Sequence, residues 1–191
     1  FLLTGCGYLA TKVIHFGDIP PPSGRYSVGT SLFYWIDNSR TEWYTEELTG
    51  PRKMMVQIWY PGDGQSAEKE PYMDRLGDRI PAFAMEMGLP PFAIENMANI
   101  KANSISDIPA LSGSFPVVLF SHGLGGMRTQ NTVQAEELAS RGYVVVAPDH
   151  QYDANVSLYP DNSSADYISN VPKNSSEEEW WDIRLKQLNK R

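Results

Sequence analysis

The segment that could most directly take part in chemistry follows a short apolar run, Val117–Phe120. It reads Ser-His-Gly-Leu-Gly-Gly over residues 121–126, so three glycines fall within four positions. Glycine lets a backbone turn sharply and approach a ligand closely. The apolar run predicts a fully buried strand in the middle of a parallel sheet, and residues 130–141 predict a helix. The pattern is therefore strand, glycine loop and helix.

Two kinds of site use this pattern. A phosphate cradle needs G-x-G-x-x-G or G-x-x-x-x-G-K-[ST], whereas HGLGGMRT has neither spacing and no Lys before Thr129. The oxyanion loop of α/β-hydrolases carries His-Gly between a strand and the first long helix. Leu124 is placed to supply the backbone N–H that stabilises the negative oxygen of a tetrahedral intermediate. The loop around it would be shaped by His122, Gly123, Gly125 and Gly126. A third interpretation is a plain strand-to-helix turn.

A wider resemblance favours the oxyanion loop. Residues 121–154, SHGLGGMRTQNTVQAEELASRGYVVVAPDHQYDA, resemble the platelet-activating-factor acetylhydrolase family, the calcium-independent phospholipase A2-like branch of the α/β-hydrolases. The resemblance includes PSGRYSVGT at 22–30 with WIDNSR downstream, and RKMMVQIWYPGD at 52–63. It implies a carboxylic-ester hydrolase with a serine nucleophile, an Asp and a His. It also implies a phospholipid substrate with a short or oxidised acyl chain.

The nucleophile elbow of this fold, G-x-S-x-G, does not occur in the sequence. In the family the elbow follows the helix that begins near Glu177, so the resemblance implies that the whole triad lies beyond Arg191. We therefore expect an N-terminal fragment that contributes an oxyanion loop, is inactive alone and requires a missing C-terminal half. The alternatives are a hydrolase of another ester or a polyester, and a non-catalytic remnant or binding module.

The composition fits a globular protein and excludes several function classes. The 191 residues, 41% of them hydrophobic, are long enough for one domain with a core. A net charge of −7 argues against nucleic acid as a partner. A single Cys excludes an internal disulfide, and no Cys/His cluster has metal-ligand spacing, so we expect neither metal nor cofactor. The expected partners are an ester or phospholipid substrate and, as a candidate, a membrane surface.

Residues 1–19 predict an apolar tail, the end of a signal or membrane segment, which leads into a proline linker at 19–23. Residues 3–6, Leu-Thr-Gly-Cys, match the bacterial lipoprotein cleavage pattern, in which Cys6 would be lipidated. The remaining apolar run is too short to span a bilayer by itself. We expect the parent protein to be secreted or membrane-attached, and residues 20–191 to form an incomplete α/β-hydrolase domain.

The elements that must position the loop follow from the hydrophobic pattern. Residues 26–37 and 53–60 predict an antiparallel hairpin, and Tyr143–Ala147 predicts a buried strand parallel and adjacent to Val117–Phe120. The expected fold class is α/β, with a mostly parallel sheet, an antiparallel N-terminal hairpin and flanking helices. Residues 38–48 and 151–174 are polar and predict loops.

Three further expectations concern two helices and one pair of adjacent residues. Pro90-Pro91 predicts the start of a helix whose apolar face is either a core stripe, which we favour, or a lipid-facing lid. Ser176 and Glu179 predict a capping box for the last helix. Asp149 and His150 are adjacent at the end of a strand, so their side chains should point in different directions. We expect a structural or pocket-lining role for both.

Overall fold

The computed structural model describes residues 17, 19–42, 50–64, 69–169 and 171–189. The predicted apolar tail therefore lies almost wholly outside the described residues, as does Cys6. Within the described residues, no helix has the length and apolar character needed to cross a membrane.

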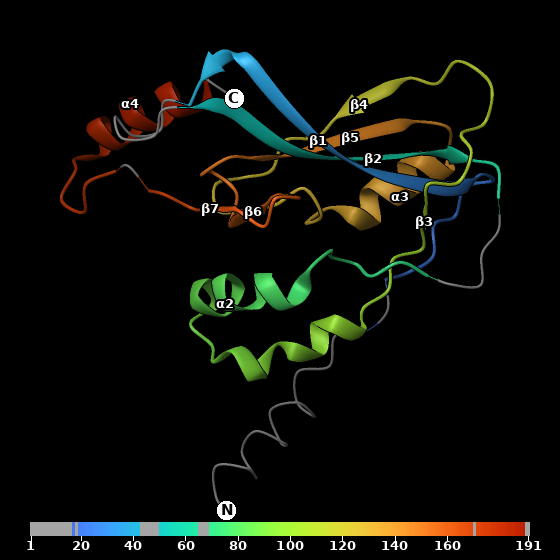
Figure 1. Ribbon diagram of the computed structural model, residues 1–191, viewed down its shortest axis with the longest axis horizontal. Coiled ribbons are helices and arrows are strands. Elements are labelled where there is room, and N and C mark those ends of the chain that lie inside the picture. The colour runs from blue at the N-terminus through green and yellow to red at the C-terminus, as the bar shows by residue number, and fades with distance from the viewer. Residues whose placement is uncertain (1–16, 18, 43–49, 65–68, 170, 190–191) are drawn as a thin grey trace, which may run out of the picture.

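A mixed sheet forms the centre of the described chain (Figure 1). Its five strands run in the order β3-β1-β2-β5-β4. Their bounds are Ser27–Thr41 for β1, Pro51–Gly62 for β2, Ile105–Ser106 for β3, Val117–Leu119 for β4 and Val144–His150 for β5. The pairs β1–β2 and β2–β5 are antiparallel, and β1–β3 and β4–β5 are parallel. The expected α/β fold is confirmed.

The predicted N-terminal hairpin is confirmed, but it is longer than its apolar pattern. Strands β1 and β2 pair from Ser27↔Gly62 to Asp37↔Arg52, and after an irregularity Thr41 pairs with Pro51. The amide of Glu42 also donates to the carbonyl of Gly50 at 2.7 Å. The loop predicted to begin at residue 38 is therefore wrong as far as Thr41. Backbone pairing continues there because polar side chains can stay in solvent on both faces.

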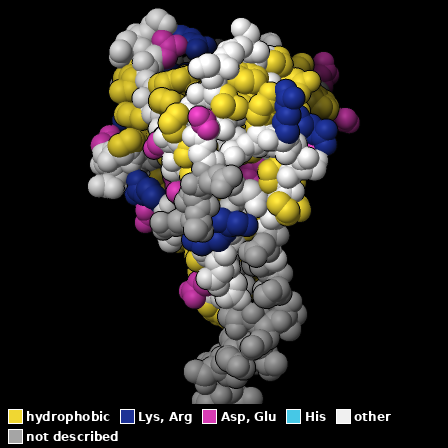
Figure 2. All heavy atoms as spheres, turned by 90° about the vertical axis from the view of Figure 1, so that its right-hand side faces the viewer, with side chains coloured by type: hydrophobic (Ala, Val, Ile, Leu, Met, Phe, Trp, Pro, Cys, Tyr) yellow, Lys and Arg dark blue, Asp and Glu magenta, His cyan; other side chains and the backbone are white. Residues whose placement is uncertain are grey.

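The prediction that β4 is fully buried within the sheet is wrong. Strands β4 and β5 are parallel and adjacent as expected, but β4 is the edge strand of the described sheet. Val117 and Leu119 are 61% and 79% exposed, because only the opposite face of β4 packs on a described helix. Figure 2 faces the right-hand side of Figure 1 and shows hydrophobic side chains gathered in the upper part of that face. Some apolar side chains therefore lie on the surface of the molecule and not in its core.

Helix α3, Thr132–Ser140, lies under the sheet and closes the main core (Figure 1). Its apolar face, Ala135, Leu138 and Ala139, packs there. The core joins this face to side chains of three strands: Val28, Trp59, Val145 and Ala147. The chain entering β1 passes so close to the end of α3 that a Cβ on Gly24 would lie 2.2 Å from the Ser140 carbonyl oxygen. Only glycine fits there.

A second layer lies below the sheet in Figure 1. It contains α2, Leu76–Met87, and two short 3₁₀ helices, η1 at Pro91–Ala93 and η2 at Glu95–Asn99. Between this layer and the sheet lies a hairpin of β6, Val156–Leu158, and β7, Ser164–Asp166, within the segment predicted to be loop. The single helix predicted from Pro90 is wrong in form, because non-helical backbone at Ile94 divides it. Its core face is confirmed at Ala93 and Ile100, which are buried.

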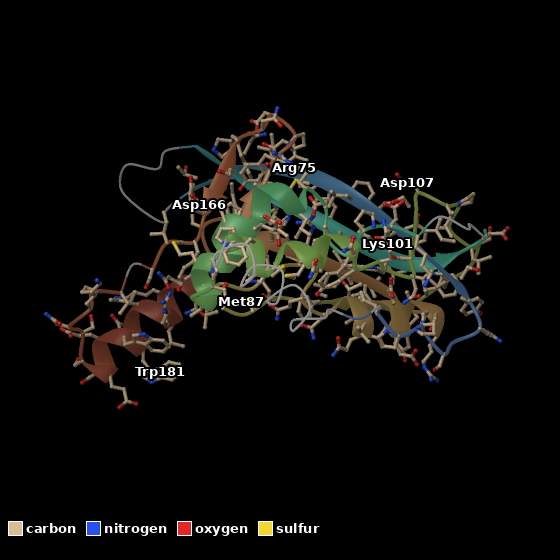
Figure 3. All side chains as sticks on the ribbon, turned by 90° about the horizontal axis from the view of Figure 1, so that it is seen from below. Arg75, Met87, Lys101, Asp107, Asp166 and Trp181 are labelled. Atoms are coloured by element: carbon tan, nitrogen blue, oxygen red, sulfur yellow. The ribbon has the colours of Figure 1, made fainter. Side chains whose placement is uncertain are left out.

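The last helix, α4, spans Glu177–Leu188 and begins with the predicted capping box. The amide of Glu179 donates to Ser176 Oγ at 3.2 Å, and the Ser176 amide donates to Glu179 Oε2 at 2.9 Å. Trp181, Leu185 and Leu188 are exposed, and Trp181 points away from the sheet in Figure 3. The buried face instead carries Arg184, which donates to Gln187 Oε1 at 2.6 Å and to Tyr167 Oη at 3.0 Å.

A buried carboxylate on α3 fastens the segment before β3 and gives the first testable prediction. Oε1 of Glu136 accepts from the backbone amides of Asn103 and Ser104, both at 2.7 Å. Glu136→Ala should destabilise the fold by about 1–3 kcal/mol for each buried donor left without an acceptor. Glu136→Gln keeps one acceptor oxygen and should cost less. Urea unfolding followed by circular dichroism measures both.

The control for this experiment is Gln134→Ala, which removes an exposed side chain from the same helix. It should change the free energy of unfolding by less than about 0.5 kcal/mol. Equal losses in Glu136→Ala and Gln134→Ala would contradict a fastening role for the Glu136 carboxylate.

Candidate active site

The glycine loop from residue 121 to residue 126 connects β4 to the segment that begins α3, as the sequence pattern predicts. Its tight turn is at Leu124–Gly125, where Gly125 has φ of 70°, a conformation that favours glycine. The Gly126 amide donates to the Gly123 carbonyl at 3.0 Å. A Cβ on Gly126 would meet Gln130 Oε1 at 2.2 Å. The backbone conformation thus favours glycine at 125, and a side chain at 126 would have to displace the Gln130 side chain and would lie 3.0 Å from the Gly123 carbonyl oxygen.

His122 clamps the start of the loop to β5. Its ring is buried, with Nδ1 2.6 Å from the Gly123 carbonyl oxygen and Nε2 accepting from the His150 amide at 3.0 Å. Both bonds form only if Nδ1 carries the proton and Nε2 is an acceptor, which is the neutral Nδ1–H tautomer. The side chain thus joins the loop to the neighbouring strand, through one bond within the loop and one bond to β5.

The clamp also orients the amide of Leu124. The Gly123 carbonyl and the Leu124 N–H belong to one planar trans peptide, so they point in opposite directions. The carbonyl is held by His122 and Gly126. The Leu124 amide donates no hydrogen bond within the described part of the chain. A fixed N–H without an internal acceptor is a group that can bind an external oxygen.

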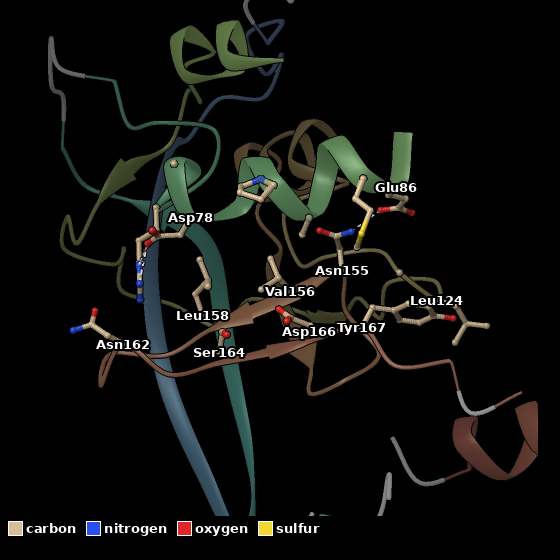
Figure 4. A pocket seen from close by; sticks show the side chains of 16 residues that line it. Asp78, Glu86, Leu124, Asn155, Val156, Leu158, Asn162, Ser164, Asp166 and Tyr167 are labelled. Carbon is tan, nitrogen blue, oxygen red and sulfur yellow. Dashed lines mark hydrogen bonds and ion pairs between the residues drawn. The ribbon is translucent and has the colours of Figure 1, made fainter. Parts of the chain in front are cut away.

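A cleft of about 890 Å³ adjoins this turn, and Leu124 and Gly125 line it. The cleft lies between α2 and the β6–β7 hairpin, with Leu124 and Tyr167 at one end (Figure 4). Its middle is largely apolar, and Val156 and Leu158 form part of the wall there. The cleft can therefore hold an apolar chain whose end reaches the Leu124 turn.

Three hydrogen bonds fix α2 against the hairpin and so define the width of the cleft. Asn155 Nδ2 donates to Glu86 Oε2 at 2.7 Å. Arg75 Nη1 donates to the Tyr159 carbonyl at 2.9 Å, and Arg79 Nη1 donates to the Val156 carbonyl at 3.0 Å. Figure 3, seen from below, shows Arg75 and Met87 on this layer with Asp166 nearby.

A buried network of four charges holds the cleft, the loop and the sheet together. Arg128, just after the loop, pairs with Asp149 of β5 and with Asp74, which precedes α2. Arg79 of α2 lies 3.1 Å from Asp74 and 3.8 Å from Asp149. The Arg128 amide also donates to Asp149 Oδ1 at 2.7 Å. The four formal charges cancel, which is the condition for burying them.

The pKa shifts in this network follow from burial and from mutual attraction. Burial by itself would raise the pKa of Asp74, but the Arg128 and Arg79 guanidiniums outweigh it and hold that pKa below its usual range. Burial, and then the positive charge of Arg128, lower the pKa of Arg79. For Arg128 the two carboxylates outweigh burial and raise the pKa. Asp74 is therefore ionised and Arg128 protonated at neutral pH.

The adjacent residues Asp149 and His150 point in different directions, as predicted, and do not form a catalytic pair. Asp149 binds Arg128, whereas His150 Nε2 lies 2.9 Å from Ser121 Oγ. Sequence reasoning missed both partnerships. One signal was present for the second, because Ser121 and His150 lie at the carboxyl ends of neighbouring parallel strands, which share one edge of the sheet. No local pattern marked Arg128 as the partner of Asp149.

The network gives a prediction about acid stability. Because the folded-state pKa of Asp74 is depressed, its contribution to stability is present above the unfolded-state pKa of about 3.9 and is lost as pH falls further. Asp74→Asn should be less stable than wild type at pH 7, and its stability should depend less on pH below about 4. Urea unfolding at a series of pH values measures this dependence.

Asp182→Asn is the control, since it removes an exposed carboxylate on α4 that pairs with Lys186. Its stability should follow the wild-type pH dependence. If the free energy of unfolding of Asp74→Asn falls at acidic pH as steeply as that of the wild type, the role of Asp74 in the network is contradicted.

Comparison with known proteins agrees with this geometry. The family model described as "Platelet-activating factor acetylhydrolase, isoform II" matches residues 13–191. A platelet-activating factor acetylhydrolase from Bos taurus is 31% identical over 163 residues, which is 79% of this chain and 32% of the relative. The corresponding protein of Canis lupus familiaris is 27% identical over 175 residues, 85% of this chain and 35% of the relative. The chain thus spans about a third of the length of these curated relatives.

A solved structure with a similar fold is a ferulic acid esterase from Streptomyces cinnamoneus. It superposes with a TM-score of 0.68 at 26% sequence identity, over 90% of this chain and 47% of the esterase. The resemblance inferred from the SHGLGG and VQIWYP motifs is thereby confirmed. By its strand–loop–helix order, its mixed sheet and a family match over nearly all its length, this chain belongs to the platelet-activating-factor acetylhydrolase family, isoform II.

Proposed function

We propose that this chain supplies the oxyanion side of a carboxylic-ester hydrolase of the platelet-activating-factor acetylhydrolase type. The observation that carries the proposal is the Leu124 amide. It has no acceptor among the residues that the structure describes, its peptide plane is fixed through the Gly123 carbonyl, and Leu124 lines the cleft. A preorganised N–H of this kind stabilises the negative oxygen that develops when an ester carbonyl is attacked.

The reaction assigns separate tasks to the parts of the site. The ester carbonyl lies against the Leu124 turn, and an apolar arm of the substrate occupies the cleft between α2 and the β6–β7 hairpin. The nucleophile comes from sequence other than these 191 residues, because no G-x-S-x-G occurs among them. The proposed substrate class is an ester of a phospholipid with a short or oxidised acyl chain, as the family resemblance implies; the relatives are named for an acetylhydrolase that acts on platelet-activating factor. An ester of another acid is the alternative, since the similar solved structure is named a ferulic acid esterase.

One observation favours a second candidate function, a hydrolase in which Ser121 is itself the nucleophile. Ser121 Oγ lies 2.9 Å from His150 Nε2, within reach for proton transfer to a general base. We place this candidate second because Ser121 follows an edge strand directly and does not sit on the strand–turn–helix elbow that exposes the serine in this fold.

The variant Leu124→Pro tests the first proposal. It is assayed in a form of the protein that contains the nucleophile and hydrolyses p-nitrophenyl acetate, so that kcat can be measured. Proline deletes the N–H, and loss of one oxyanion donor should lower kcat by about 10²–10³. Leu124→Ala is the matched control and should keep most of kcat, because the donor is main-chain. Circular dichroism must show that the proline variant is folded. A folded Leu124→Pro enzyme with near-normal kcat would contradict the oxyanion role and would show that the loop is only a tight turn.

A fluorophosphonate probe separates the two candidates on the 191-residue chain. We expect no stoichiometric labelling of any serine, because the nucleophile elbow is absent from this sequence. Labelling that disappears in Ser121→Ala and persists in Ser157→Ala would instead establish Ser121 as the nucleophile. Mass spectrometry of the intact chain reads out either result.

A further inference from the structure

Two buried hydrogen-bond donors beneath the sheet have no acceptor within the described part of the chain. They are Nε1 of Trp59, on β2, and Nε of Arg128, after the glycine loop. Both residues are only 1% exposed. A buried donor without an acceptor costs about 1–3 kcal/mol, and more when the donor is charged. Such groups in folded proteins are almost always satisfied by protein or by ordered water.

Both terminal nitrogens of the Arg128 guanidinium have carboxylate partners. One pairs with Asp149 and the other pairs with Asp74, whereas Nε has neither carboxylate as its acceptor.

Trp59 and Arg128 line the same small cavity, of about 60 Å³, between the sheet and α3. Its walls are mostly apolar and include Val118, Phe120 and Leu138. Asn131 and Gln134, whose side-chain amides contain acceptor oxygens, line it as well. One water in liquid occupies about 30 Å³, so the cavity has room for one or two.

We propose that this cavity is a hydration site, in which a bound water accepts hydrogen bonds from Trp59 Nε1 and Arg128 Nε. A water oxygen can accept both bonds and still donate its own protons, whereas apolar ligands would leave both donors unsatisfied. An inorganic anion is disfavoured because Asp74, Asp149, Arg79 and Arg128 already cancel to zero charge, and the other walls are apolar.

The site is independent of the proposed esterase function and has a structural consequence. The water completes the hydrogen bonding of Arg128, whose backbone amide and side chain both bind Asp149. It thereby links β2 to the residue that fixes the end of the glycine loop against β5.

Nuclear magnetic resonance on the 191-residue chain tests the site directly. We expect a nuclear Overhauser cross-peak between the Trp59 indole Nε1–H and water. Its sign should differ between laboratory-frame and rotating-frame experiments, because the water stays bound for longer than the tumbling time of the protein. The exposed indole of Trp181 is the internal control and should show only short-lived water. The Arg128 Nε–H should show the same long-lived cross-peak as Trp59.

The variant Trp59→Phe removes one donor while keeping an aromatic ring in the core. In this variant the cross-peak from Arg128 Nε–H to water should weaken several-fold, whereas Trp181→Phe should leave it unchanged. If Trp59→Phe does not fold, the two wild-type cross-peaks decide the question alone. Absence of a water cross-peak at Trp59, or a shift of its indole resonance that saturates with added chloride, would overturn the proposal.

Discussion

The charges of Asp74, Arg79, Arg128 and Asp149, of which all but Asp74 are buried, are the interaction on which the rest of this structure depends. They come from three parts of the chain that are far apart in sequence: the start of α2, the segment after the glycine loop, and the end of β5. Removing one partner of such a network leaves an uncompensated buried charge and costs about 3–5 kcal/mol, a large part of the 5–15 kcal/mol that stabilises a typical domain. The network therefore explains why α2 and the β6–β7 hairpin keep a fixed position relative to the sheet.

The glycine loop is constrained at both ends. These constraints hold a flexible sequence in one conformation. At its start, the His122 ring joins the Gly123 carbonyl to the His150 amide of β5. After its end, Arg128 binds Asp149 of the same strand through backbone and side chain. The glycines permit the turn, and the flanking residues select one conformation of it. The oxyanion role proposed for Leu124 depends on this combination, because a donor that must reorganise during the reaction loses much of its effect.

The cleft and the loop are built by different elements. The loop belongs to the strand–loop–helix unit of β4 and α3, whereas the cleft is formed by α2 and the β6–β7 hairpin. The family match extends over both parts of the chain. Changes in α2 or the hairpin can therefore alter the shape of the cleft without changing the residues of the loop.

The sequence by itself determined what depends on local pattern. The hairpin of β1 and β2, the parallel pairing of β4 with β5 and the capping box at Ser176 follow from residue types at fixed spacing, and the family follows from the resemblance of the SHGLGG and VQIWYP motifs. Only the tertiary structure decided which surfaces are covered and which distant side chains meet. Val118 packs in the core while its neighbours Val117 and Leu119 are exposed, because a helix covers only one face of β4. Asp149 binds Arg128 and His150 binds Ser121, because the register of β4 and β5 and the path of the loop bring these groups together. Periodicity reports which residues prefer burial, but the partner of a buried charge is set by the packing of the whole chain.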